Sequence, residues 1–161
     1  MKYILVLSVL TLVICSGSCK HRQIGLEEFE KITYKYGPVA ANRAPATIIT
    51  VSYQNDTARF KVSKHFKFVS KVDGEMKGKK DVLKSGGVSR SKLIGLIATI
   101  NSNNFMGLGE KYRDPEILDG DVESLRLELK DTTRQVVLVN VSNERFDAVA
   151  EYLETIVVGA D

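Results

Sequence analysis

Tryptophan is absent from the 161 residues, and the chain has only two histidines, two cysteines and three prolines. These scarcities narrow the chemistry that the chain can carry out. Neither His21 nor His65 lies in a His-x-x-x-His or Cys/His spacing, so no zinc site is expected. Without tryptophan, the aromatic platforms of a glycoside hydrolase cleft are not indicated either. Beyond the N-terminus, no apolar run approaches the roughly 20 residues that a membrane-spanning helix needs.

The first 18 residues contain the three parts of a secretory signal peptide. Lys2 precedes an apolar run over residues 4–14, and the small residues Ser16, Gly17 and Ser18 follow it. A short positive region, a short apolar region and a small-residue cleavage site in this order are typical of export signals. We therefore expect residues 1–18 to be removed from the mature chain.

The next residue is a cysteine, and Ser16-Gly17-Ser18-Cys19 resembles the lipobox of bacterial lipoproteins. Ser16 stands where that family prefers an aliphatic residue. Cys15 would be lost with the signal peptide, and acylation best explains a lone thiol at the cleavage point. The resemblance implies that lipid on Cys19 anchors the chain to a membrane of the bacterial cell envelope, with residues 19–28 as a lipidated tether. If Cys19 is not lipidated, the same signal predicts a periplasmic or secreted protein.

Residues 29–161 have the size of a single domain, and their periodicity predicts an α+β fold. Apolar residues alternate with polar ones in several segments and recur at helical spacing in two others. The expected elements are strands at 32–36, 47–53, 58–62 and 66–72, a helix from Ser89, strands at 125–130 and 135–141, and a last helix capped by Ser142 or Asn143. We expect residues 74–87 to form a long loop or a weak strand, and residues 109–121 to be irregular.

Short turns between successive strands favour antiparallel pairing. The prediction is therefore an antiparallel sheet of about six strands, in the order ββββ-α-ββ-α, with two helices packed on one face. The opening Phe29-Glu30-Lys31-Ile32-Thr33-Tyr34, followed by Gly37-Pro38, is similar to small uncharacterised bacterial envelope lipoprotein domains. That resemblance implies no activity.

Charge is unevenly distributed along the chain. Residues 59–92 hold eleven Lys and Arg but three Asp and Glu, whereas residues 93–161 hold six basic and thirteen acidic residues. The basic stretch is a candidate for binding an anionic surface, and an ordinary solvated strand face is the alternative. A nucleic-acid partner is not expected, because export would remove it. The candidate residues are Lys61, Lys64, Lys67, Lys71, Lys77, Lys79 and Lys80.

Two short motifs were weighed for catalysis or metal binding. Ser89-Arg90-Ser91-Lys92 matches the Ser-x-x-Lys of penicillin-binding enzymes, but the partner motifs are absent and helix capping explains Ser89. Asp119, Asp121 and Glu123 are weak candidates for calcium, since their spacing does not fit an EF-hand loop and is ordinary turn chemistry. We expect His65 in an exposed, Lys-rich hairpin turn.

Together these observations predict a lipid-anchored module of the cell envelope that binds an envelope protein or an anionic surface, or serves as an accessory subunit, without catalysis and without a cofactor. The alternative is a small envelope hydrolase whose site has no recognised motif.

Overall fold

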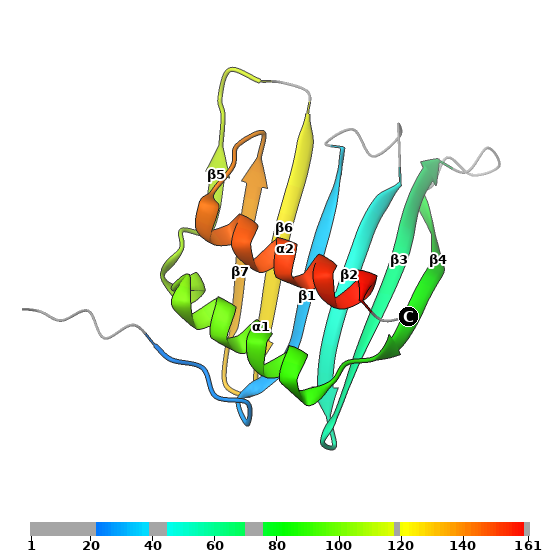
Figure 1. The fold of residues 1–161 in the computed structure, drawn as a ribbon. Helices are drawn as coiled ribbons and strands as arrows, with labels where there is room; N and C mark the ends of the chain where they lie inside the picture. Colours follow the sequence, from blue (N-terminus) through cyan, green and yellow to red (C-terminus); the bar gives the residue numbers. More distant parts are fainter. Residues whose placement is uncertain (1–21, 39–44, 70–75, 118–119, 160–161) are drawn as a thin grey trace, which may run out of the picture.

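The structure is a computed structural model, and it describes residues 22–38, 45–69, 76–117 and 120–159. These residues form one mostly antiparallel seven-stranded sheet, two α-helices and a 3-10 turn, which confirms the expected α+β class (Figure 1). The elements are β1 Phe29–Pro38, β2 Ala46–Gln54, β3 Thr57–Val69, β4 Met76–Gly87, α1 Arg90–Ser102, η1 Phe105–Gly107, β5 Lys111–Arg113, β6 Asp121–Leu129, β7 Thr133–Val139 and α2 Glu144–Val158.

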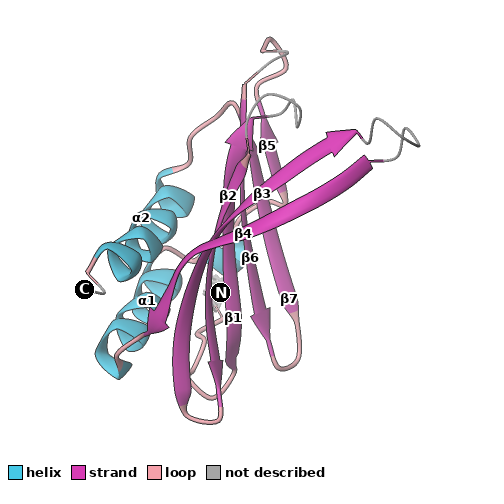
Figure 2. Ribbon diagram, turned by 90° about the vertical axis from the view of Figure 1, so that its right-hand side faces the viewer, coloured by secondary structure: helices cyan, strands magenta, loops and turns pink. Residues whose placement is uncertain are grey.

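The strand order is β4-β3-β2-β1-β6-β7-β5. The first four strands form an antiparallel meander, and the chain then crosses the sheet through α1 so that β6 pairs on the free side of β1. β5 is parallel to β7 at the edge. Figure 2 shows both helices on the same side of the sheet, while no helix of the described chain covers the opposite side.

Both helices begin and pack as their sequences predict. The Ser89 hydroxyl accepts a hydrogen bond from the Lys92 N–H at 3.3 Å, and the Asn143 side chain accepts from two N–H groups at the start of α2. The predicted apolar stripes face the sheet, because residues three and four apart share one side of a helix. Their buried members are Leu93, Leu96, Ile97, Ile100, Phe146, Val149, Leu153 and Ile156.

The β2–β3 hairpin confirms the turn expected at residues 54–56. Asn55 and Asp56 both have positive φ, 50° and 58°. A two-residue turn with both φ values positive matches the right-handed twist of the strands that it joins. Asn and Asp tolerate this conformation better than most residues, which is why this short polar pair joins two strands tightly.

The prediction for residues 58–87 was right in part. The strand expected at 58–62 and the described part of the strand expected at 66–72 belong to one thirteen-residue strand, β3. His65 therefore lies within a strand, between Ala46 and Lys80, instead of in a hairpin turn. Of the two alternatives for residues 74–87, a long loop or a weak strand, the structure has the strand: β4 spans Met76–Gly87, although its glycines and lysines have low strand propensity. Pairing with β3 along its length stabilises β4, and Gly86 leaves room for the Phe60 ring, which a Cβ there would approach to 2.7 Å.

The seventh strand was also missed. Residues 109–121 were expected to be irregular, but Lys111–Arg113 form β5 beside β7. A strand of three residues is too short to show period-two alternation of apolar and polar residues in the sequence. This strand forms because it pairs with β7. Tyr112 packs against the core while Lys111 and Arg113 are exposed.

Candidate functional site

Period-two alternation gives the sheet two chemically different faces. The covered face packs against the helices, and its central side chains, such as Ile32, Leu125 and Leu127, are fully buried. The residues between them point to the opposite side, which we call the open face (Figure 2). Directly opposite residues on paired strands share a face, so the register carries this assignment across all seven strands.

The open face is strongly basic. Within the described strands, the register and alternation place on it eight Lys and Arg side chains but one carboxylate, that of Glu128. All eight except Lys31 are exposed, and Lys31 is half-buried. The basic residues are Lys31, Lys35, Arg59, Lys61, Lys80, Lys111, Arg113 and Arg126.

Glu128 offsets only part of this charge. Its carboxylate lies 2.8 Å from the Lys31 ammonium and 3.1 Å from Nε of Arg126. One negative charge is thus shared by two positive ones. The other six basic side chains of the open face have no acidic partner among the described residues. Because these groups are exposed, each retains its hydration and is available to an anionic ligand.

An uncharged strip runs through the middle of this basic surface. On β2, the open-face positions are Ala46, Ile48, Thr50, Ser52 and Gln54, and we call the three polar ones nearest the turn, Thr50, Ser52 and Gln54, the β2 strip. Ser52 lies opposite Lys31 of β1 on one side and Arg59 of β3 on the other. Neighbouring strands are about 4.8 Å apart, so the cations flank the strip at roughly that distance on each side.

Thr50 follows one pleat along the strand. It lies opposite Thr33 on β1 and Lys61 on β3, so at this position a cation flanks the strip on the β3 side only. At the other end of the strip, next to the β2–β3 turn, there is a hollow of about 310 Å³. The hollow is lined by Ser52, Gln54, Asn55, Thr57 and Arg59. Hydroxyl and amide groups therefore form a floor between Lys31 on the β1 side and Arg59 and Lys61 on the β3 side.

The structure brings together only part of the lysine set that the sequence predicted. Lys61 and Lys80 lie on the open face, whereas Lys64 and Lys79 occupy register positions on the other face. Asp81 pairs with Lys79 at 3.2 Å. The set is therefore split by the pleat, because neighbouring positions in a strand point to opposite sides. Lys67 and Lys77 lie in β3 and β4 but their side chains are outside the described part, and Lys71 lies outside the described residues.

Six basic residues of the open face were not among the candidate residues. Arg59 lies in the basic stretch at 59–92 but was not named as a candidate. The other five come from strands on the other side of β2 and are Lys31, Lys35, Lys111, Arg113 and Arg126. The signal that could have found Lys35 and Arg126 is alternation, since each lies between apolar residues of a predicted strand. Lys111 and Arg113 carried no such signal because β5 is too short.

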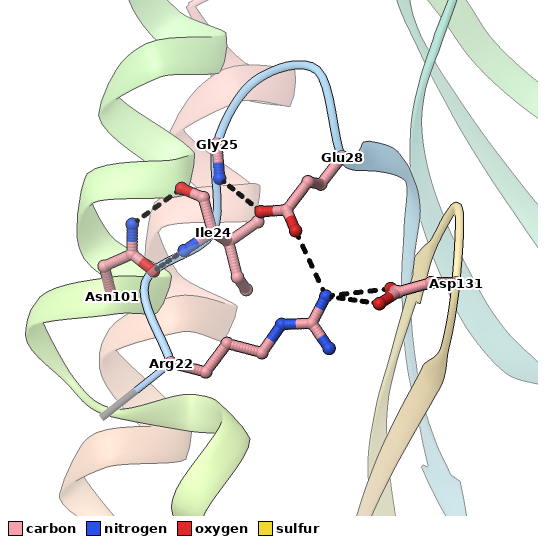
Figure 3. Close-up of polar contacts among 6 residues, drawn as sticks. All are labelled: Arg22, Ile24, Gly25, Glu28, Asn101 and Asp131. Carbon is pink, nitrogen blue, oxygen red and sulfur yellow. Dashed lines mark hydrogen bonds and ion pairs between the residues drawn. The ribbon is translucent and has the colours of Figure 1, made fainter. Parts of the chain in front are cut away.

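A second polar cluster holds the N-terminal segment against the domain (Figure 3). The Asn101 side chain, on α1, accepts a hydrogen bond from the Ile24 N–H at 2.9 Å and donates to the Ile24 carbonyl at 3.0 Å. Arg22 donates to both carboxylate oxygens of Asp131, at 2.8 and 2.9 Å, and to Glu28 at 3.2 Å. We call these four residues together with Ile24 the N-terminal clamp.

The N-terminal clamp packs part of the expected tether, residues 19–28, against the domain. Ile24 is 4% exposed and belongs to the core, so the packed domain includes residues before Phe29. The sequence did not indicate this packing, because one apolar residue in a polar segment gives no periodic signal. The hydrogen bond from the Gly25 N–H is the main cause that lowers the pKa of Glu28, and the hydrogen bond from Arg22 adds to it. The hydrogen bond from Arg22 also lowers the pKa of Asp131. The proposed lipid site, Cys19, lies outside the described residues.

Two of the three calcium candidates, Asp121 and Glu123, lie within the described residues. Asp119 lies outside the described residues, and Asp121 is exposed at the start of β6. Glu123 accepts a hydrogen bond of 2.6 Å from the Tyr34 hydroxyl, which is buried on the covered face. Burial, followed by this hydrogen bond, raises the pKa of Tyr34. No group of three His, Cys, Asp or Glu within the described ranges could hold a metal ion.

The Ser-x-x-Lys residues are engaged in helix capping and packing. The Ser89 hydroxyl caps α1 and lies 3.1 Å from the Ser91 hydroxyl. The Lys92 ammonium donates to the Gly159 carbonyl at 2.8 Å, beyond the end of α2. The lysine is therefore directed to the other helix and does not approach Ser89 as a base would.

Comparison with protein-family models and with curated proteins found no match for the chain. Among the helices of the described chain, none has the length and apolar character required to cross a membrane. The open face is thus the feature of the structure that a functional proposal has to explain.

Proposed function

We propose that the chain is a lipid-anchored protein of the bacterial cell envelope, held by acyl groups on Cys19, whose open face binds an anionic partner. It acts as a binding or accessory module without catalysis. The observation that carries the proposal is the gathering of eight basic side chains and one carboxylate on one exposed face. Cations at this density attract anions over about 10 Å at moderate ionic strength.

The anchoring half of the proposal is supported by the first 19 residues alone. Two or more acyl chains are needed for stable attachment to a bilayer, and the lipobox resemblance implies that number. Attachment would hold the domain at a surface and would restrict its partners to those in the envelope.

The lipid anchor and the binding function are tested by separate experiments, and the first concerns the anchor. The full chain is expressed in a bacterium, and the mass of the mature N-terminal peptide is measured beside that of Cys19→Ala. We expect fatty acyl mass on Cys19 and loss of membrane fractionation in the variant. An unmodified Cys19 would remove the anchor.

The binding half is tested with the purified full chain in non-ionic detergent, titrated with a panel of anionic ligands and their neutral counterparts. We expect binding to at least one anionic ligand, weakened by salt. Absence of binding to every anion, or equal binding to the neutral ligands, would refute the binding function.

A further inference from the structure

We infer that the open face binds one extended chain of an acidic glycan, laid along the β2 strip between Lys31 of β1 and the basic pair Arg59 and Lys61 of β3. This inference rests on the proposed function and specifies the partner of the same face. The observations that carry it are the register positions of Thr50 and Ser52, the flanking cations and the hollow next to the turn.

The first step concerns shape. Lys and Arg side chains are long, whereas Thr50 and Ser52 are short, so the strip lies below the charged groups on either side. The two flanking strands are two strand spacings apart, or about 10 Å. A flat anionic surface such as a bilayer would meet the ends of Lys31, Arg59 and Lys61 without reaching the hydroxyls between them. A narrow, extended ligand reaches both.

The second step concerns the groups that the floor offers. Thr50, Ser52 and Gln54 each provide a donor and an acceptor at alternate positions of β2, so they repeat every 6–7 Å along the strand. Sugar hydroxyls pair with such groups, and carboxylate or sulfate groups pair with the cations at the sides. A polypeptide with acidic side chains would use the cations but would present fewer hydroxyls to the floor.

The third step concerns what the face lacks. In the described strands, the register places every Phe and Tyr on the covered face, including Tyr34, Tyr53 and Phe60. His65, opposite Ala46, has an aromatic ring on this face, but stacking of bases or of neutral sugar rings has no Phe or Tyr platform beside the β2 strip. Recognition depends on charge and hydrogen bonds, which favours an acidic glycan over a neutral one.

The test compares two double variants with equal loss of charge on the same face. Arg59→Ala/Lys61→Ala removes the row beside the strip, whereas Lys111→Ala/Arg113→Ala removes two exposed charges on the distant β5 edge. The ligands are alginate and dextran sulfate, with dextran, polyglutamate and phosphatidylglycerol vesicles beside them. Vesicle binding is taken as the excess over neutral phosphatidylcholine vesicles, because the acyl anchor inserts into both kinds of vesicle. We expect the β3 pair to weaken binding of the acidic glycans about tenfold or more, and the β5 pair less than about threefold.

A third variant examines the floor. Thr50→Val keeps the shape and removes the hydroxyl, and we expect it to weaken alginate binding about fivefold while leaving vesicle binding unchanged. Unchanged thermal unfolding of each variant shows that the fold is intact.

Equal losses from the β3 and β5 pairs would overturn the inference, since they would indicate diffuse attraction. Tighter binding of vesicles or of polyglutamate than of both acidic glycans would also overturn it. Either outcome leaves the proposed function standing, whereas absence of binding to every anion refutes that function itself.

Discussion

The two faces of the sheet are built from the same strands and differ in every other residue. Leu125, Leu127 and Leu129 of β6 are buried against the helices, while Arg126 and Glu128 between them reach the open face. On the covered face, apolar burial stabilises the fold by about 25 cal/mol per Å² removed from water. The open face contributes little to stability and is therefore free to specialise in binding.

The largest effect expected from this contrast is on stability. Leu127→Ala removes a fully buried side chain and leaves a cavity, so the free energy of unfolding should fall by about 3 kcal/mol. Arg126→Ala, one residue earlier on the open face, should change it by less than about 0.5 kcal/mol. Urea unfolding of both variants measures the difference. Similar losses would show that the open face is packed against another element.

The N-terminal clamp extends the covered side beyond the sheet. Ile24→Ala should lower the free energy of unfolding by about 2 kcal/mol, because its side chain is buried in the core. Gln23→Ala is the matched control, since Gln23 is exposed and should change stability by less than about 0.5 kcal/mol. If both substitutions lowered the free energy of unfolding by less than about 0.5 kcal/mol, residues 22–28 would be a tether that does not pack on the domain.

A third effect is smaller and depends on pH. Tyr34→Phe removes the hydrogen bond to Glu123 and should lower the free energy of unfolding by about 1 kcal/mol at neutral pH. The pKa of Tyr34 is raised in the folded state, while an unfolded tyrosine ionises near pH 10. The stability that Tyr34 contributes is therefore fully present below about pH 10 and decreases as the pH rises further.

Urea unfolding at several alkaline pH values tests this sign. We expect the advantage of the wild type over Tyr34→Phe to shrink above about pH 10. The comparison isolates Tyr34 because the other five tyrosines are common to both proteins. An advantage that grows with pH would show that the folded state favours the ionised phenol.

Elements with their own periodicity could be predicted from the sequence, and those that depend on a partner could not. The stripe of α1 and the Asn55-Asp56 turn carry local signals, so their positions were right. β4 and β5 have weak strand propensity and form because β3 and β7 offer backbone groups that need hydrogen bonds.

The candidate site was only partly predictable for the same reason. Counting charges along the chain identified Lys61 and Lys80 but also included Lys64, which the pleat directs to the other face. Lys31 and Arg126 are distant from Lys61 in sequence, and only the strand order β3-β2-β1-β6 brings them onto one surface. Alternation assigns a residue to a face, whereas the order of strands, which decides its neighbours, is a property of the whole fold.

The smallest effect concerns Glu128, the carboxylate between Lys31 and Arg126 on the open face. Glu128→Gln removes two contacts at the sheet surface, so the free energy of unfolding should change by less than about 0.5 kcal/mol. The same change releases Lys31, next to the β2 strip, and Arg126, one strand further away, and should tighten alginate binding about twofold to threefold, most clearly at low salt. Fluorescence anisotropy of labelled alginate measures it, with Glu116→Gln, an exposed acidic residue outside the strands, as the control. An equal gain in both variants would mean that net charge alone, and no particular part of the open face, attracts the ligand.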